Sequence, residues 1–309
     1  MKIFIDGSAG TTGLKIHDRI KNRKNVELIT LSDENRKDEK ARKEAINASD
    51  VTFLCLPDAA AIEAAAMVEN HDTVIIDTST AHRTAENWTY GFAEIGKRAE
   101  IAQSKRIANP GCHASGFISL VYPLVKAGII PRDALLSAYS LTGYSGGGKK
   151  MIAEYESESR NPLLDSPRVY GLTQNHKHLP EMMKLSGLEN APAFFPVVGD
   201  FYSGMQVTVP LFASQINGNI LDIKEIYREC YHSTIVHFNE NGDENGFTST
   251  TRLAGMDDMS ISVFGNDERI MLVSRYDNLG KGASGAAIQN LNIVCGLDET
   301  EGLILSERV

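Results

Sequence analysis

The sequence predicts an α/β protein with two parts, a doubly wound parallel sheet followed by an α+β domain with a mostly antiparallel sheet. Short apolar runs alternate with helical segments over the first hundred residues, a pattern typical of a parallel sheet with helices on both faces. Alternating apolar segments then recur between residues 194 and 274 with one helix among them, which indicates antiparallel strands. The hydrophobic pattern therefore changes about one third of the way along the chain, and we expect the two parts to meet there.

The composition is that of a globular protein long enough for two domains. The chain has 309 residues, of which 42% are hydrophobic and 23% charged, and its formal net charge is −9. This charge argues against nucleic acid or an anionic membrane as a partner, and no apolar run approaches the ~18 residues of a membrane span. The four cysteines are widely spaced without metal-ligand spacing. We therefore expect a cytoplasmic protein with free thiols and no metal.

The first element is a strand, Lys2–Ile5, followed by a glycine turn and a helix that starts near Leu14. Three glycines form G-x-x-G-x-x-G, a variant of the dinucleotide fingerprint, directly after an N-terminal strand. Glycines let the backbone approach a pyrophosphate while the helix N-terminus supplies N–H donors. The sequence thus predicts a Rossmann-type site, held here by Gly7, Ser8, Gly10, Thr11, Thr12 and Gly13.

The second strand, Val26–Leu31, ends at a residue that bears on the choice of dinucleotide. Sites for NAD usually carry Asp or Glu there to bind the ribose 2′-hydroxyl. This strand ends at Ser32, with Arg36 close behind. A hydroxyl and a cation suit a 2′-phosphate, so we expect NADP; the alternative is that Arg36–Arg42 is only a solvated helix face.

Two further buried strands, Val51–Leu56 and Thr73–Asp77, flank an alanine-rich helix. Ligands of doubly wound sheets lie at the carboxyl ends of the strands. We therefore expect Leu56 and Pro57 to contact the cofactor, and Ser79 and Arg83 to contact the substrate. A surface position for the arginine is an equally plausible interpretation.

A short strand, Arg106–Ala108, leads into Asn109-Pro110-Gly111-Cys112, and an apolar helix follows. Proline and glycine predict a turn that delivers Cys112 to the first turn of that helix. Unpaired N–H groups and the helix dipole there favour a thiolate. The competing interpretation is a small buried hydrophobic residue, as most cytosolic cysteines are.

The second half opens with a strand over residues 135–141 and a glycine-rich loop over residues 142–150. The loop lacks the Ser or Thr of a P-loop, so we expect it to be flexible and to offer N–H groups to a ligand. A helix is expected from roughly Ile223 to Phe238, and a final helix after Asn278–Ala286.

A second chemical cluster lies at His176-Lys177-His178-Leu179-Pro180-Glu181. Histidine is the usual acid or base at neutral pH, and Glu181 could orient one imidazole. Two alternatives stay open: metal binding by the H-x-H pair, for which further ligands are not evident, and a pair of surface histidines.

Taken together, these motifs resemble the short-form N-acetyl-gamma-glutamyl-phosphate reductases, which are related to the aspartate-semialdehyde dehydrogenases. The similarity runs almost end to end, and the order and spacing of the motifs carry it. The matching segments are residues 7–14, 77–83, 90–92, 109–112, 144–149, 176–181, 198–201 and 278–283. One departure is His113, where members of that family commonly have Tyr.

The resemblance implies a covalent mechanism on an acyl phosphate. Cys112 would attack the acyl phosphate to form a thioester, NADPH would reduce it to N-acetylglutamate 5-semialdehyde, and His176 would act as acid/base. His178 and Glu181 would assist. The resemblance also implies a homo-oligomer, a dimer or tetramer. Further expected cofactor contacts are Ser145, Gly146, Asn278, Lys281 and Gly282, and further expected substrate contacts are Asn109, Gly148 and Lys149. The expected domains are residues 1–111 with 283–309, which bind NADP, and residues 112–282, which carry catalysis.

Three rival functions stay open at this point. The same chemistry could act on another acyl phosphate, the chain could be a catalytically silent NADP-binding redox sensor, or Cys112 and His176 could form a thiol hydrolase. The hydrolase leaves the glycine turn unexplained. The sequence also leaves open whether the substrate is free or linked to a carrier protein.

Overall fold

The computed structural model describes residues 1–307 and divides into two compact units. The first unit comprises Met1–Pro110 and Ala283–Leu303; the second comprises Gly111–Gly282 and the segment that begins at Ile304. We had expected that last segment in the first unit. It groups with the second because the Ile304 amide donates to the Asp257 carboxylate at 2.9 Å and Ser306 bonds the Asp258 carboxylate.

The first unit contains a parallel six-stranded sheet with strand order β2-β1-β3-β4-β6-β5. Every pairing in it is parallel, as expected for a doubly wound sheet. The strands are β1 (Lys2–Asp6), β2 (Glu27–Ile29), β3 (Val51–Leu54), β4 (Val74–Asp77), β5 (Thr89–Tyr90) and β6 (Arg106–Ala108).

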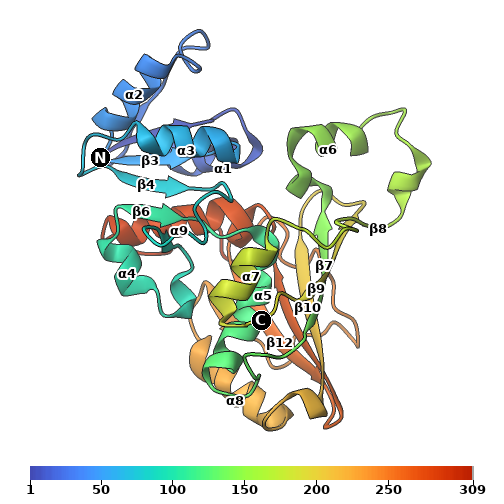
Figure 1. The fold of residues 1–309 in the computed structure, drawn as a ribbon. Helices are drawn as coiled ribbons and strands as arrows, with labels where there is room; N and C mark the ends of the chain where they lie inside the picture. The colour runs from blue at the N-terminus through green and yellow to red at the C-terminus, as the bar shows by residue number, and fades with distance from the viewer. Residues whose placement is uncertain (308–309) are drawn as a thin grey trace. The chain divides into compact units, whose positions relative to one another are not determined.

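Helices cover both faces of this sheet. Side chains of a strand point alternately to the two faces, so each strand contributes to the core under both sets of helices. Adjacent residues of β1 enter different cores: Ile3 and Ile5 join one apolar cluster, whereas Phe4 joins the other. Figure 1 shows α2 and α3 on one side of these strands and α4 and α9 on the other. The helices are α1 (Thr11–Ile20), α2 (Glu39–Ala48), α3 (Asp58–Ala66), α4 (Arg98–Gln103) and α9 (Gly285–Val294).

The second unit is built on a seven-stranded sheet with strand order β11-β12-β13-β10-β7-β9-β8. Only the pairings β11–β12 and β7–β9 are parallel among its described strands, so the expected mostly antiparallel sheet is confirmed. The strands are β7 (Ser137–Gly143), β8 (Arg168–Val169), β9 (Ala193–Gly199), β10 (Met205–Phe212), β11 (Val236–Phe238), β12 (Met259–Gly265) and β13 (Arg269–Tyr276).

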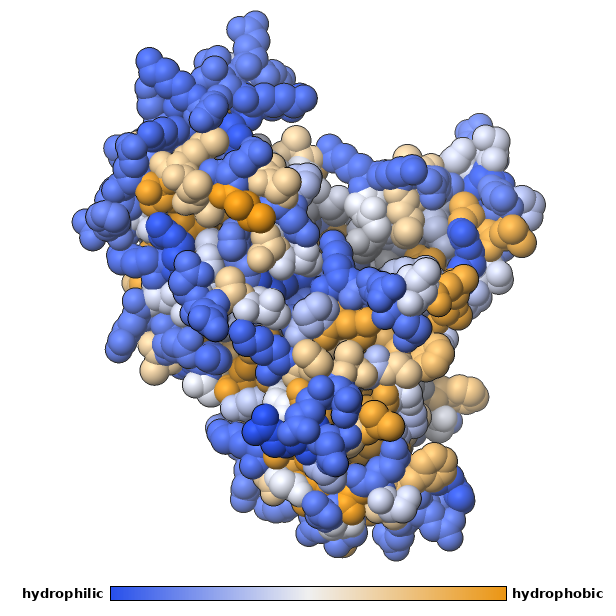
Figure 2. All heavy atoms as spheres, in the orientation of Figure 1, coloured by the Kyte–Doolittle hydropathy of each residue, from blue (hydrophilic) through white to orange (hydrophobic). Residues whose placement is uncertain are grey.

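One face of the second sheet is covered by helices, and the other is open. The long helix α5 (Cys112–Lys126) packs on β10 and β13, and α8 (Ile220–Cys230) packs on β11 and β12. The open face carries exposed aromatic side chains at Tyr139, Phe195 and Phe212. In Figure 2, hydrophobic surface lies over this part of the sheet.

Two sequence expectations in the second unit are wrong. The glycine-rich stretch over 142–150 is not a flexible loop, since a 3₁₀ turn (Tyr144–Gly147) leads directly into α6 (Gly148–Tyr155). The helix expected to reach Phe238 ends at Cys230, and Val236–Phe238 forms β11. The β-branched run before β11 favours a strand, and pairing with β12 stabilises it.

Within residues 1–307 no helix combines the length and the apolar character that crossing a membrane requires.

The packing of α5 on the sheet predicts the effect of one added methyl group. A Cβ at Gly116 would lie 2.5 Å from the Tyr276 hydroxyl and 2.5 Å from Val207 Cγ2. Because overpacked cores lose about 1–3 kcal/mol, we expect Gly116→Ala to lower the free energy of unfolding by that amount in urea denaturation. Gly146→Ala is the control, since its Cβ would have only ordinary contacts of 3.4 Å or more. Equal stability of the two variants would contradict this packing.

Candidate active site

Cys112 is the first residue of α5, as the sequence predicted, and it is partly exposed. Gly111 is the N-cap, with extended backbone angles (φ −78°, ψ 146°). The first N–H groups of a helix have no intrahelical acceptor, and the positive end of the dipole lies there. This position therefore stabilises negative charge on the sulfur or on an oxygen that reacts with it.

Tyr276 holds the first turn of α5 in place from the neighbouring strand β13. Its hydroxyl donates to the Cys112 carbonyl at 2.6 Å and accepts from the Gly116 amide at 3.1 Å. The phenol is fully buried. Gly116 is the residue that makes room for it, because any side chain there would overlap the hydroxyl.

The predicted histidines lie immediately before and at the N-cap of α7 (Leu179–Ser186). His178 is buried and has helical backbone angles, so the segment turns and is not the extended strand that would place both imidazoles on one side. The His176 and His178 rings meet edge to face with centroids 4.8 Å apart, and the His178 amide donates to His176 Nδ1 at 3.2 Å. Surface exposure of the pair is thus wrong for His178.

Glu181 links the histidines to the start of α5. Its carboxylate is buried at 1% exposure. One oxygen lies 3.9 Å from His178 Nε2, and the other accepts from the Gly111 amide at 3.3 Å. The N-cap of the cysteine helix and the histidine turn therefore share one carboxylate.

His113, the departure noted in the sequence, is part of the same cluster. Its Nδ1 is 2.7 Å from the Ser140 hydroxyl and its Nε2 is 2.6 Å from the Tyr170 hydroxyl. Its ring centroid lies 5.5 Å from that of His176 and 5.5 Å from that of His178. Both ring nitrogens are thus occupied by hydroxyl groups, which fixes the ring beside Cys112.

Burial keeps two of these imidazoles neutral. It lowers the pKa of His113 to about 3, with nearby His176 acting in the same direction. It also lowers the pKa of His176 to about 4, aided by the charge of Lys177. At pH 7 both rings are therefore uncharged. Burial and the nearby Cys112 raise the pKa of Tyr170, so its hydroxyl stays protonated.

These parts are the ones that acyl transfer requires. A thiol at a helix start can act as nucleophile, a neutral imidazole can accept its proton, and N–H groups of the first turn can bind an oxyanion. No group of three or more His, Cys, Asp or Glu in residues 1–307 has the geometry of a metal site.

The glycine turn of the first unit borders a cavity of about 580 Å³. Gly7 has φ +86°, and a side chain there would overlap the Cys55 carbonyl. Helix α1 begins at Thr11, so its first N–H groups follow the turn directly. A close backbone approach and a helix N-terminus fit a dinucleotide pyrophosphate. The cavity lining includes Gly7, Ser8, Leu31, Arg36, Lys37, Arg42 and Leu56.

Two residues were expected to determine whether the site prefers NADP or NAD, and only one of them, Arg36, lines this cavity. Arg36 lines the cavity and forms an exposed ion pair with Asp33 at 3.3 Å. Ser32 is exposed and accepts backbone N–H bonds from residues 35 and 36. Arg42, which the alternative interpretation of the sequence assigns to a solvated helix face, also lines the cavity and is paired with buried Asp6 at 2.8 Å.

Other predicted cofactor residues form a connected group in the second unit. The Asn278 amide donates to the Ser145 hydroxyl at 3.0 Å and accepts from the Gly204 amide at 3.0 Å. Lys281 is buried at 1% exposure, whereas Gly146 is exposed. A Cβ at Gly282 would lie 3.0 Å from Cys112 Cβ, so this backbone passes next to the thiol.

The predicted substrate residues of the first unit are engaged in its own structure. The Ser79 hydroxyl donates to Asp77 at 2.7 Å. Arg83 is buried and donates to the carbonyls of Asn109 and Thr78 at 2.9 and 3.0 Å. Asn109 donates to the Ala283 carbonyl at 3.0 Å. In the second unit, Gly148 and exposed Lys149 begin α6. Pro57, the N-cap of α3, follows the cavity residue Leu56.

Sequence reasoning missed three residues of the cluster: Ser140, Tyr170 and Tyr276. Each lies on or next to a strand distant in sequence from the Cys112 turn. No local motif marks them. The single hint was Gly116 within the apolar helix, which indicates a close approach by another element.

Comparisons with known proteins agree with this organisation. Residues 2–104 match the family model described as "Semialdehyde dehydrogenase, NAD binding domain", and residues 112–278 match "Semialdehyde dehydrogenase, dimerisation domain". The chain is 42% identical to the N-acetyl-gamma-glutamyl-phosphate reductase 2 of Nostoc sp., over 98% of this chain and 99% of that protein. It is also 42% identical to the N-acetyl-gamma-glutamyl-phosphate reductase of Brucella ovis, over 96% and 99%.

Solved structures share the fold at low identity. Aspartate semialdehyde dehydrogenase II from Vibrio cholerae, complexed with ASA, has a TM-score of 0.73 and 16% identity over 96% of this chain and 98% of that one. The Candida albicans aspartate semialdehyde dehydrogenase with NADP has a TM-score of 0.66 and 15% identity, over 96% and 99%.

The buried neutral His113 predicts a pH dependence of stability. Its pKa is about 3 in the folded protein and 6.5 when unperturbed, so below pH 6.5 the unfolded chain binds a proton that the folded chain does not. Between pH 6.5 and 4 this lowers the free energy of unfolding by up to about 3 kcal/mol. We expect His113→Gln to lose less stability over this interval in urea titrations. Identical losses in both proteins would contradict a neutral buried His113.

Proposed function

The chain belongs to the N-acetyl-gamma-glutamyl-phosphate reductases of the semialdehyde dehydrogenase family, and from this premise we propose its reaction. It reduces N-acetyl-L-glutamyl 5-phosphate to N-acetyl-L-glutamate 5-semialdehyde with NADPH and releases phosphate, as a step of arginine biosynthesis. The observation that best supports this is Cys112 at the first turn of α5, with neutral imidazoles beside that turn.

The first half of the proposed reaction is acyl transfer to sulfur. His176, neutral at pH 7, takes the proton of the Cys112 thiol. The thiolate attacks the acyl carbon, the bond from that carbon to the phosphate oxygen breaks, and a thioester remains on Cys112. The proton on His176 is then available to the departing phosphate. N–H groups at the start of α5 stabilise the tetrahedral oxyanion.

The second half regenerates the thiol. NADPH, when bound, supplies the hydride that reduces the thioester. The N–H groups at the start of α5 hold the oxygen of the resulting tetrahedral species until the carbon–sulfur bond breaks and the aldehyde leaves. The Cys112 thiolate then takes up a proton from solvent, so one proton is consumed per turnover. His178 and Glu181 keep His176 in place, since they join its turn to Gly111.

The cavity at Gly7 is the proposed site of the dinucleotide. Its backbone approach and the start of α1 suit the pyrophosphate, and Arg36, Lys37 and Ser32 suit a 2′-phosphate. Further proposed cofactor contacts are Gly10, Thr11, Thr12, Gly13, Leu56, Pro57, Ser145, Gly146, Asn278, Lys281 and Gly282. Proposed substrate contacts are Ser79, Arg83, Asn109, Gly148 and Lys149.

A homo-oligomer through the open sheet face is part of the proposal. Tyr139 pairs with Phe195 and with Thr208, so these side chains share that face with exposed Phe212 on β10. The family model that covers these strands is described as a dimerisation domain. A reducing compartment such as the cytoplasm suits a chain whose four cysteines are free thiols.

Loss of the thiol is the direct test of the proposed function. We expect the wild type to catalyse repeated turnovers of NADP reduction by N-acetylglutamate 5-semialdehyde only when phosphate is present. Cys112→Ser should lose at least ~10³-fold in kcat, because a serine hydroxyl is a far weaker nucleophile. Cys230→Ser, at an exposed position on α8, is the matched control and should retain activity.

Activity that survives in Cys112→Ser would overturn covalent catalysis at this residue. Turnover on aspartate semialdehyde, but not on N-acetylglutamate 5-semialdehyde, would overturn the substrate assignment. NADP binding without turnover on any semialdehyde would leave the silent sensor as the function.

The proposed contact between Arg36 and the 2′-phosphate of NADPH can be tested by substitution. Removing the Arg36 side chain deletes a charged contact to the 2′-phosphate but no contact to NADH. Because hydrogen bonds to charged groups contribute about 1.5–3 kcal/mol, Arg36→Ala should raise KM for NADPH roughly tenfold or more and leave KM for NADH unchanged. Equal changes for both cofactors would show that Arg36 does not contact the 2′-phosphate.

A further inference from the structure

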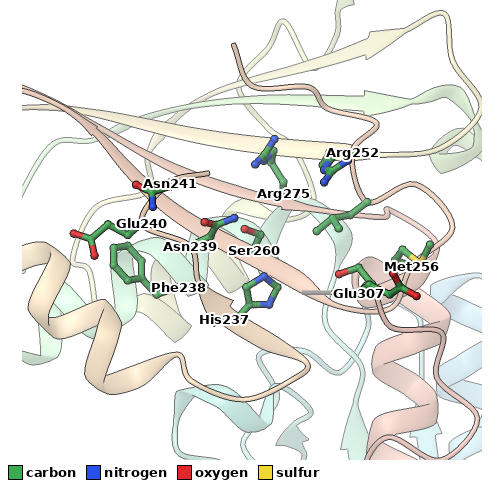
Figure 3. A pocket seen from close by; sticks show the side chains of 12 residues that line it. His237, Phe238, Asn239, Glu240, Asn241, Arg252, Met256, Ser260, Arg275 and Glu307 are labelled. Carbon is green, nitrogen blue, oxygen red and sulfur yellow. The ribbon is translucent and has the colours of Figure 1, made fainter. Parts of the chain in front are cut away.

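A second cavity, of about 460 Å³, lies in the second unit and has no part in the proposed reaction. It is bounded by β11–β13, by the stretch between β11 and β12, and by the segment that begins at Ile304. Figure 3 shows His237, Ser260, Arg275 and Arg252 among the side chains that line this space; the first three come from neighbouring strands.

The strand register explains why these polar side chains meet. His237 of β11 pairs with Ser260 of β12, and Ser260 pairs with Arg275 of β13. Residues paired across neighbouring strands project to the same face of a sheet. The three therefore form a continuous polar row on the face of the sheet opposite to α5, where the stretch between β11 and β12 covers Arg275. The row ends in the cavity.

One arginine of the lining has a guanidinium without a partner among the described residues. Arg275 is buried at 3% exposure and is paired with Glu244 and with the Gly242 carbonyl. Glu240 contacts Arg228 and Lys224 instead of the cavity cations. Within residues 1–307, the guanidinium of Arg252 forms no ion pair or hydrogen bond. An anion is the natural complement of such a side chain.

A buried hydroxyl points to the same ligand chemistry. Ser260 is 5% exposed, and its hydroxyl has no hydrogen-bond partner among the described residues. A buried polar group without a partner is costly, so a ligand oxygen that accepts from Ser260 would be stabilising. The amides of Asn239 and Asn241 add further donors to the lining. Glu307, at the rim, is the one carboxylate of the lining without a cationic partner in the described structure.

The cavity is connected to Cys112 through a single strand. Arg275 and Tyr276 are adjacent in β13, so their side chains lie on opposite faces of the sheet. Arg275 borders the cavity, and Tyr276 bonds the Cys112 carbonyl and the Gly116 amide. A ligand bound beside Arg275 would therefore lie one peptide unit of β13 away from the residue that holds the first turn of α5.

We propose that this cavity binds a small carboxylate ligand through Arg252 and Ser260, and that its occupancy changes the reactivity of Cys112 through β13. The binding half is independent of the proposed reductase activity, since it involves none of the residues assigned to catalysis. A metabolite with a carboxylate could thus regulate the thiol from the face of the sheet opposite to α5.

Calorimetric titration with succinate and with L-aspartate tests the binding half on the full-length protein. These probes differ by one ammonium group, so tighter binding of L-aspartate would assign Glu307 to that group. We expect at least one probe to bind the wild type, and Arg252→Gln to weaken it about ten- to hundredfold. Ser260→Ala should weaken it as well. Arg132→Gln is the control, because Arg132 is exposed and outside the cavity.

Alkylation of Cys112 by iodoacetamide tests the second half. A saturating probe should change the alkylation rate severalfold in the wild type and in Arg132→Gln, but not in Arg252→Gln. An effect that persists in Arg252→Gln would place the probe at the thiol itself and contradict the coupling, as would binding without any change in rate.

Three results would overturn the binding proposal. The first is that neither probe binds the wild type at 10 mM, which is about the weakest affinity of interest. The second is the same affinity in Arg252→Gln as in the wild type. The third is a loss of oligomeric mass in Arg252→Gln without ligand binding, by analytical ultracentrifugation. That result would assign the cavity to a second copy of the chain.

Discussion

The hydroxyl of Tyr276 is the contact on which the chemistry of the second unit depends. It bonds the carbonyl of Cys112 and the amide of Gly116, and it reaches both only because residue 116 has no side chain. Glu181 holds the preceding residue, Gly111, from the histidine turn. The thiol is therefore fixed from both sides of the helix start, where N–H groups that have no acceptor within the helix favour negative charge. Reactivity at this cysteine follows from backbone position more than from any single neighbouring charge.

Burial determines which histidine can do chemistry. His113 is held between two hydroxyl groups and its pKa is about 3, so it stays neutral and serves to anchor the cluster. His176 is only partly buried, and its pKa of about 4 leaves a neutral ring with access to solvent. A pKa near 4 keeps this ring unprotonated at pH 7, so it can take up a proton only transiently. On the opposite face of the sheet, the row of His237, Ser260 and Arg275 is the second place from which we propose that a ligand acts on α5.

The sequence predicted local features well and long-range contacts poorly. The glycine turn, the parallel strands and the position of Cys112 at a helix start follow from neighbouring residues, and the structure has them. The helix expected to run to Phe238 was wrong because pairing with β12 makes Val236–Phe238 a strand. Tyr276 and Tyr170 reach the site from distant strands, so no local pattern marked them. The edge-to-face contact of His176 and His178 depends on a turn that the spacing alone could not distinguish from a strand.

The central claim is that Cys112 carries the acyl group, and mass spectrometry of the enzyme tests it most directly. Without phosphate, oxidation of N-acetylglutamate 5-semialdehyde by NADP should stop at the thioester. The account predicts an N-acetylglutamyl group on the peptide that contains Cys112, and its removal when phosphate is added. An acyl group on another residue, or formation of NADPH with Cys112 unmodified, would contradict it.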